Sequence, residues 1–269
     1  MTTATVQMAY GQRRDLVEQD VEWPYEFVEH TLRPRHGSLF RWHAADHRTF
    51  VVVQGRARLE VLDETGGTDA TVYDRLGGWH ALRGTVFRFV NVGDDELVVL
   101  EAGTARGEVR QSAEAAALGR LASSRCITVS YYTVQKPWGH EIWYAQNLPG
   151  MPYAMKQIHM TAGNQSSLQS HEQKAETNHV IDGTATVLNG SFAPEDKNAV
   201  IDPATLPSAE YAAGTGWTSP PRMLHRVIAR SDYTSIEVST PELDDVIRWQ
   251  DDTGRPDGRL DSEHVAARS

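Results

Sequence analysis

The chain has 269 residues, a formal net charge of −10 and a hydrophobic content of 40%, which are ordinary values for a globular protein of one large or two small domains. The acidic balance disfavours a nucleic-acid or anionic-membrane partner, because both favour clustered Lys and Arg, but it permits a local basic pocket for a small anion. With one cysteine, Cys126, the chain cannot form an internal disulfide. No apolar signal core or membrane-spanning run is visible, so we expect a cytoplasmic protein.

Short strands and turns dominate the pattern along the chain. Residues 1–22 are polar and predict an N-terminal arm, whereas residues 23–105 alternate glycines with β-branched and aromatic segments, which predicts a first set of strands. Residues 106–128, rich in Ala, Glu, Leu and Arg, predict a linker helix. Strand patterns resume over residues 129–252, and the polar residues 253–269 predict a flexible tail.

The two strand-rich segments repeat one another, which predicts a duplicated small β-barrel. Each contains a histidine followed at the same interval by a glycine, and each continues to a later strand and an Asp-containing turn. The order of the matches is kept throughout. The matched pairs are His43 with His171, Gly55 with Gly183, Phe87 with His225, and Asp94 with Asp232.

The second segment carries residues typical of a divalent-metal site. Gln169 and His171 are two residues apart, so on a strand they point to the same face, and a bulge or turn could bring Glu176 there as well. His225 enters a later strand after two prolines. Nitrogen and oxygen ligands from adjacent strands suit a divalent cation. Gln169 is the weakest of these ligands, since it carries an amide oxygen, and it could instead hydrogen-bond a substrate.

These residues resemble the two metal motifs of the cupins. Gly163, His171, Glu176 and Gly183 resemble the first motif, and Gly214, Pro220 and His225 resemble the second. Gln169, where cupins usually carry His, is similar to one branch, the type II phosphomannose isomerases and related sugar-isomerase cupins. Three segments between residues 131 and 255 resemble that branch: Lys136–Gly139 with Glu141, Ser167–His171 with Lys174 and Glu176, and Asp244–Arg248 with Asp251, Gly254 and Arg255.

The resemblance implies an all-β fold of two tandem cupin barrels (double-stranded β-helix, jelly-roll) joined by a short helix, with a metal-binding barrel over residues 129–252. It implies one divalent metal on Gln169, His171, Glu176 and His225. Zn is the first expectation for its identity, with Mn, Co, Ni or Fe as alternatives.

This sequence departs from the branch near the place where a substrate would lie. Lys174 stands where the branch has Arg, Thr177-Asn178 replaces a His-Trp pair, and Arg222 replaces a common Gly. The stretch 189–213 is longer than usual and could form a lid or an oligomer contact. The metal site stays credible, while the substrate is left open.

The first barrel, over residues 23–105, has lost the metal positions. The repeat places Arg41 at the position of Gln169, Arg48 at that of Glu176 and Phe87 at that of His225, so that His43 alone survives. Two cations and a phenyl ring cannot bind a divalent cation. We therefore interpret this barrel as degenerate, serving packing, dimerisation or a wall of the pocket.

Several charged residues are candidates for other roles. Lys156 and Glu237 are candidate catalytic residues, and we expect burial and a nearby metal to lower the pKa of Lys156. Lys174 and Arg222 are candidates to bind a substrate phosphate or carboxylate, although a solvated surface position explains them equally well. The segment 244–255 could form a helix that closes the barrel mouth, with Arg248 paired to an acidic residue.

The resemblance implies a metal-dependent isomerase or epimerase (mannose-6-phosphate isomerase-like, in carbohydrate metabolism) that acts on a sugar, sugar phosphate or similar small polar metabolite. The metal would activate adjacent hydroxyl and carbonyl oxygens, and Lys156, Glu237 or a metal-bound hydroxide could be the base. Two alternatives stay open: a tailoring cupin that rearranges or oxidises a metabolite with Fe(II), and a non-enzymatic sugar-binding cupin. We expect a homodimer, because the polar arm has no core of its own, and no nucleic-acid or membrane partner.

Overall fold

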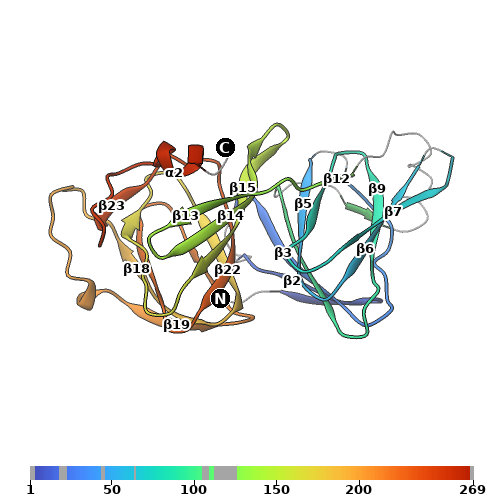
Figure 1. Cartoon of the computed structure of the whole chain (residues 1–269), viewed down its shortest axis with the longest axis horizontal. Helices are drawn as coiled ribbons and strands as arrows, with labels where there is room; N and C mark the ends of the chain where they lie inside the picture. Colours follow the sequence, from blue (N-terminus) through green and yellow to red (C-terminus); the bar gives the residue numbers. More distant parts are fainter. Residues whose placement is uncertain are drawn as a thin grey trace. The chain divides into compact units, whose positions relative to one another are not determined.

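The structure is a computed structural model that describes residues 4–17, 23–43, 46–63, 65–104, 109–111 and 126–266. Their regular structure is almost entirely β-strand, as Figure 1 shows. The chain divides into two compact units, which we call unit 1 (Met1–Ser130 with Leu148–Tyr153) and unit 2 (Tyr131–Asn147 with Ala154–Ser269). In the described part of the chain, no helix is long and apolar enough to cross a membrane.

Unit 1 consists of two antiparallel sheets. One has seven strands in the order β1-β2-β3-β10-β5-β8-β12, and the other has five in the order β11-β4-β9-β6-β7. The strands are β1 (Thr5–Met8), β2 (Gly11–Asp15), β3 (Glu26–Leu32), β4 (Arg41–His43), β5 (Arg48–Gln54), β6 (Ala57–Leu62), β7 (Thr68–Tyr73), β8 (Gly78–Ala81), β9 (Val86–Asn91), β10 (Leu97–Gly103), β11 (Val109–Gln111) and β12 (Cys126–Thr128).

Unit 2 repeats this arrangement with a six-stranded sheet, β13-β14-β15-β22-β17-β20, and a five-stranded sheet, β19-β18-β21-β16-β23. Its strands are β13 (Tyr132–Lys136), β14 (Gly139–Leu148), β15 (Met151–Met160), β16 (Leu168–Ser170), β17 (Glu176–Asp182), β18 (Thr184–Phe192), β19 (Ser208–Ala212), β20 (Gly216–Ser219), β21 (Met223–Ala229), β22 (Tyr233–Ser239) and β23 (Ile247–Gln250). The end of β14 and the start of β15, within Leu148–Tyr153, belong to unit 1. A 3-10 turn, η1 (Pro203–Thr205), and a short helix, α2 (Asp261–Ala266), complete the unit.

Buried aromatic and β-branched side chains fill the space within each unit. In unit 1, Phe50 stacks on Trp79 with 5.1 Å between ring centroids, and Phe87 meets Phe50 edge to face. In unit 2, Trp217 and Tyr233 are buried in a cluster with valine and alanine side chains from neighbouring strands. Such rings remove much apolar surface from water and dominate core energetics. These cores hold the strands whose remaining inward-facing residues form the polar sites.

The pairing register confirms the duplication. Gln169 on β16 lies opposite His225 on β21, and the equivalent residues Arg41 and Phe87 lie opposite each other on β4 and β9. On the other sheet Phe50 pairs with Glu101 as Asn178 pairs with Glu237. Because one residue of slip would turn every side chain to the other face, this agreement establishes which positions correspond.

The predicted N-terminal arm is wrong for residues 5–15. They form the hairpin β1–β2, and β2 pairs with β3. Gly11 and Gly139 begin corresponding strands, and at each a β-carbon would lie about 2 Å from a carbonyl oxygen of the neighbouring strand. Glycine is therefore required at both positions. The described arm belongs to the sheet of unit 1, which removes the reason for expecting a homodimer; the dimer itself stays a prediction.

The predicted linker helix over 106–128 falls largely on residues 105–108 and 112–125, which lie outside the described residues. Where the structure describes this region, Val109–Gln111 and Cys126–Thr128 are strands, so the helix prediction is wrong there. Both segments extend sheets, since β11 pairs with β4 and β12 with β8. Available sheet edges outweigh the helix propensity of this composition, which is a weak local preference.

The C-terminal predictions also need correction. Residues 244–255 contain the strand β23 rather than a helix, and β23 pairs with β16. The described part of the predicted flexible tail packs on unit 2, because α2 buries His264 against Tyr132 and Trp143. The Nζ atom of Lys136 donates to Glu263 at 2.5 Å and fixes the helix to the sheet.

Candidate metal centre

A tight turn between β16 and β17 brings His171 and Glu176 together. The carboxylate of Asp245 accepts hydrogen bonds from the backbone N–H groups of Glu172, Gln173 and Lys174 at 3.0, 2.6 and 3.0 Å. These three bonds hold the pKa of Asp245 below its ordinary value, against the effect of burial. The sequence allows a turn here as one possibility, and the structure shows that the side chain of Asp245, in the segment after β22, holds that turn. Asp245 lies in a motif of the sequence, but its positioning role was not predicted.

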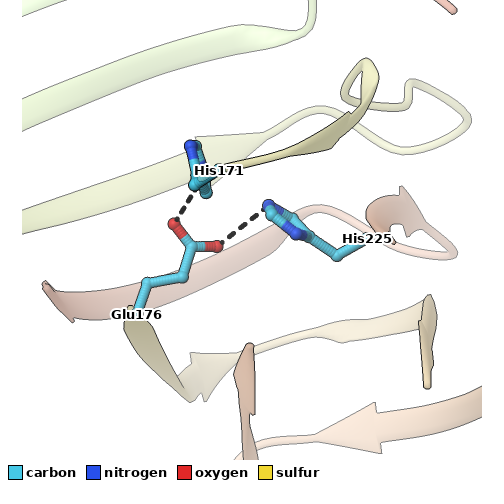
Figure 2. A group of neighbouring side chains, drawn as sticks. All are labelled: His171, Glu176 and His225. Atoms are coloured by element: carbon cyan, nitrogen blue, oxygen red, sulfur yellow. Dashed lines mark ion pairs between the residues drawn. The ribbon is translucent and has the colours of Figure 1, made fainter. Parts of the chain in front are cut away.

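Three side chains converge at the inner end of this turn, as Figure 2 shows. The Nε2 atom of His225 lies 3.2 Å from Glu176 Oε1, and the Nε2 atom of His171 lies 3.5 Å from Glu176 Oε2. All three residues are buried, and one potential ligand atom of each lies within 4.8 Å of the others. Two imidazoles and one carboxylate at such separations can hold a divalent cation between them.

The ring orientation of both histidines is fixed by the backbone. His171 Nδ1 bonds the carbonyl oxygen of Asp245, and His225 Nδ1 bonds that of Met223 at 3.0 Å. Because a carbonyl only accepts, Nδ1 of each ring must donate the hydrogen in these bonds, which leaves Nε2 of each ring directed toward Glu176. Metal-ligating histidines are commonly held in this way. The buried Nε2 of His171 has no hydrogen-bond partner, which is consistent with an atom that binds a metal ion.

The charge state of these groups also suits a cation. Burial lowers the pKa of His225 to about 4, more than the neighbouring Glu176 raises it, so the ring is neutral near pH 7. Burial raises the pKa of Glu176, but Lys174, whose Nζ lies 2.5 Å from its carboxylate, outweighs that effect and holds the pKa well below the ordinary value. Metal ligands must be deprotonated to bind. His225 and Glu176 therefore meet that condition without rearrangement.

Gln169 lies beside this group. Its Nε2 is 3.1 Å from His225 Nε2, and its Oε1 accepts from the Ser167 hydroxyl at 2.9 Å. A half-turn of the amide would direct the oxygen toward the histidines, and the Ser167 hydroxyl, which both donates and accepts, would then accept from the amide nitrogen. The position of Gln169 is compatible with the predicted fourth ligand, which stays a prediction.

A cavity of about 110 Å³ adjoins the three residues. Lys156 and Glu237 line it, with 3.4 Å between Lys156 Nζ and Glu237 Oε2. The expected lowered pKa of Lys156 is wrong in this structure: burial lowers the pKa, but the carboxylates of Glu141 and Glu237 outweigh that effect and raise it. Lys156 is therefore an ammonium group near neutral pH. Glu141 accepts a hydrogen bond from Lys156 Nζ at 3.1 Å and so raises the pKa of the lysine. The sequence placed Glu141 in a motif but did not predict this role.

The two predicted substrate-binding residues lie in different places. Lys174 lines the cavity, but its Nζ binds Glu176 at 2.5 Å and Glu237 at 3.0 Å, so its charge is already paired inside the protein. Arg222 does not line the cavity; it is exposed and reaches the carbonyl oxygen of Ala193 at 3.4 Å. Its φ of 65° shows that it serves a turn. A substrate-binding role for Arg222 is therefore not supported by its position.

The equivalent positions of unit 1 hold ion pairs. Glu101 accepts from Arg41 at 2.8 Å, from Arg48 at 3.0 Å and from His30 at 2.6 Å, and all four side chains are buried. The surviving histidine, His43, is buried with neither ring nitrogen hydrogen-bonded. Burial and the two arginines lower its pKa well below the ordinary value. These contacts support the interpretation of a barrel that has exchanged metal ligands for internal salt bridges.

Comparison with known proteins supports the fold. No protein-family model and no curated protein sequence matches the chain. Similar solved structures include the oxalate decarboxylase of Lactobacillus farciminis (TM-score 0.65, 12% identity, covering 91% of this chain and 86% of that one). A Bacillus subtilis oxalate decarboxylase mutant has a TM-score of 0.62 and 15% identity, and the match covers 88% of this chain and 74% of that one. The vicilin of Corylus avellana has a TM-score of 0.65 and 11% identity, and the match covers 89% of this chain and 83% of that one.

At such identities the likeness shows the fold alone. These neighbours are bicupins, and this chain has the same architecture, so the predicted all-β fold of two tandem jelly-roll barrels is confirmed. The resemblance to the sugar-isomerase branch stays a prediction.

Proposed function

We propose that the protein is a metal-dependent isomerase or epimerase that acts on a sugar, a sugar phosphate or a similar small polar metabolite. The observation that carries the proposal is the direction of the ligand atoms. His171 and His225 direct Nε2 toward the two carboxylate oxygens of Glu176, beside a cavity that is also lined by the partly buried Lys156 and the buried Glu237. A site that combines metal ligands with proton-transfer groups supports isomerisation.

The sequence segments that resemble the sugar-isomerase branch support the same proposal. They are far apart in the chain, yet residues from all three line the one cavity, among them Trp138, Gln169 and Arg255. A chance resemblance gives no reason for such convergence.

A divalent cation bound by these ligands would polarise the carbonyl and hydroxyl oxygens of the substrate and acidify the neighbouring C–H. Lys156, kept as an ammonium by Glu141 and Glu237, is placed to donate a proton from Nζ to a substrate oxygen. Glu237 is the better candidate for the base, since its carboxylate can take the proton from carbon and return it to the adjacent carbon. Its contact with Lys156 would let the two groups act in turn.

The proposal is tested by proton exchange at carbon. The purified protein, loaded in turn with Zn, Mn, Co, Ni or Fe, is incubated in deuterium oxide with aldoses, ketoses and their phosphate esters, and the loss of carbon-bound hydrogen is followed by NMR. We expect exchange next to the carbonyl with at least one substrate. Glu237→Gln should slow it by about a hundredfold or more at unchanged metal content, a common size for acid–base catalysis. Full metal loading without exchange on any substrate would contradict the proposal.

One alternative has a specific observation in its favour. Two histidines and one carboxylate are also the ligand set of Fe(II) oxygenases, and His171, Glu176 and His225 have that composition. An oxygen electrode separates the two chemistries, because substrate-dependent oxygen uptake by the Fe(II)-loaded protein would favour oxidation. Exchange in deuterium oxide under nitrogen would favour isomerisation.

A further inference from the structure

The cavity wall beyond the metal group is basic, although the chain as a whole is acidic. Its lining contains six Lys or Arg side chains and three Glu side chains, in a chain of net charge −10. A basic pocket on an acidic protein has to be assembled locally, and it raises the concentration of anions there. The six cations are Lys136, Lys156, Lys174, Arg248, Arg255 and Arg259.

Five of these cations already have a carboxylate partner. Each forms an ion pair with an N···O distance of 2.5 to 3.2 Å: Lys136 with Glu263, Lys156 with Glu141, Lys174 with Glu176, Arg255 with Asp251, and Arg259 with Asp244. Arg248 is the exception: it has no ion pair with any of the described carboxylates. The expectation that it pairs with an acidic residue is therefore wrong within that part of the chain.

The guanidinium of Arg248 is nevertheless held in place. Its Nη1 donates to the carbonyl oxygens of Pro256 and, at 2.8 Å, of Gly258. Its Nε is buried and has no hydrogen-bond partner, and no bond reaches Nη2 from the described residues. A buried donor without a partner is costly and calls for an explanation. Nε and Nη2 together form the edge with which arginine binds carboxylates and phosphates.

Arg255, in the same cavity, shows what this edge does when it is filled. Its Nε and Nη2 donate to the carboxylate of Asp251 at 2.9 and 2.7 Å. Burial and the positive charge of Arg255 both lower the pKa of Arg248. An anion at the open edge of Arg248 would satisfy the donors and offset that repulsion.

The strand register directs Arg248 toward the metal group. Gln169 lies opposite His225 on one side and opposite Arg248 on the other, so the three residues form a row across β21, β16 and β23. Directly opposed residues of antiparallel strands share a face. With about 4.8 Å between strands, the backbone positions of Arg248 and His225 are roughly 10 Å apart. A small molecule can contact both.

We propose that Arg248 binds a carboxylate or phosphate group of the substrate, while the other end of the same molecule lies at His171, Glu176 and His225. The inference rests on the proposed function for the presence of a substrate at those residues, and it narrows the substrate to a small anion. The positive charge of Arg248 favours an anion, and its open Nε–Nη2 edge favours an oxyanion that offers two oxygens in one plane.

Titration calorimetry on the full-length, metal-loaded protein tests the inference with two probes, methylphosphonate and acetate. We expect the wild type to bind at least one of them, and the stronger probe identifies phosphate or carboxylate as the preferred group. Arg248→Gln should weaken that binding roughly tenfold to a hundredfold, and Arg248→Lys by a similar factor, because lysine keeps the charge but loses the two-donor edge.

Arg226→Gln is the matched control. Arg226 follows His225 on β21, is buried, binds one backbone carbonyl and also has a partnerless Nε, but it does not line the cavity. Anion binding should be unchanged in this variant. Metal content and melting temperature, measured on every variant, exclude a general loss of structure.

The outcomes separate this inference from the proposed function. Equal anion binding by the wild type and Arg248→Gln, equal losses in Arg248→Gln and Arg226→Gln, or no binding of either probe by the wild type would each overturn the anion site, whatever the exchange experiment shows. Anion binding that depends on Arg248, together with no carbon–hydrogen exchange on any substrate, would overturn the isomerase and leave the anion site standing.

Discussion

The two units carry the same ion-pair arrangement with the charges reversed. In unit 1, Asp46 pairs with Arg48 at 3.2 Å; in unit 2, Lys174 pairs with Glu176 at 2.5 Å. The residues occupy equivalent positions of the repeat, two apart at the start of a strand. A backbone that places two side chains in contact accepts either order of charge, because the attraction is the same. Only one order leaves a carboxylate where a metal can use it.

A second pair of equivalent residues explains how each interior stays balanced. Glu101 and Glu237 are both buried, and each contacts two cations. In unit 1 these are Arg41 and Arg48, which stand at the positions equivalent to Gln169 and Glu176 of unit 2. In unit 2 they are Lys156 and Lys174, which lie beside the ligands. A buried charge must be paired wherever it lies, so the position of the cations decides whether the barrel can bind a metal.

The largest expected effect is the loss of the metal from unit 2 alone. His225→Ala removes a ligand whose Nδ1 is already oriented by the backbone, and we expect the metal content to fall from one ion per chain to nearly zero. His43→Ala, at the histidine of unit 1, is the matched variant and should keep the full content. Elemental analysis of both proteins gives the answer. Metal retained in the first variant or lost in the second would break the comparison.

The next effect concerns the two buried glutamates. Glu101→Gln should lower the free energy of unfolding of unit 1 by about 3–5 kcal/mol, because Arg41 then has no carboxylate among its described neighbours. Glu237→Gln should cost unit 2 only about 1–2 kcal/mol, since Lys156 keeps Glu141 and Lys174 keeps Glu176. Hydrogen exchange resolved by peptide, at increasing denaturant, measures each unit separately. Equal losses would show that the two interiors are balanced in the same way.

Much of this comparison can be predicted from the sequence. The equal intervals from His43 to Gly55 and from His171 to Gly183 give the duplication, and with it the loss of ligands in unit 1. The repeat extends further than those matches. Tyr10-Gly11 precedes Trp138-Gly139 by the same 128 positions that separate His43 from His171. This match was the available signal that the N-terminal residues form strands.

The remaining features depend on contacts between distant residues. Asp245 builds the turn after His171 from 74 positions away, and a carboxylate in a loop carries no sign of which N–H groups it will accept from. The raised pKa of Lys156 follows from two carboxylates on other strands. The helix prediction near residue 109 is wrong because β4 offered a free sheet edge with which these residues pair. The composition of a segment does not indicate whether such an edge lies nearby in the fold.

The pH dependence of unit 2 gives a third test. Burial raises the pKa of Glu141, but Lys156 and Lys136 outweigh it and lower the pKa to about 2. A carboxyl with a lowered pKa stabilises the fold at pH values above its unfolded pKa, and that stabilisation is lost as the pH falls from about 4.5 toward 2. We expect unit 2 to lose about 3 kcal/mol of stability across that range, the equivalent of this shift.

Denaturant unfolding between pH 6 and pH 2, compared with Glu141→Gln, isolates this effect. The variant should be less stable at pH 6 and should show a flatter dependence on pH. A variant that is as steep as the wild type would assign the acid sensitivity of unit 2 to other groups.

The smallest expected effect lies at the C-terminal helix, for which the described residues of unit 1 offer no counterpart. Lys136 Nζ is shared between Glu263 at 2.5 Å and Glu141 at 3.6 Å, so Glu263→Gln leaves the lysine one carboxylate. The loss should be about 1 kcal/mol or less, the usual size for a partly exposed ion pair. Because α2 covers the cavity through His264, we expect faster amide exchange in residues 255–266 and unchanged exchange in β17 and β22. Acceleration in those central strands as well would mean that the helix supports the barrel itself, and that unit 2, unlike unit 1, depends on its C-terminal segment to fold.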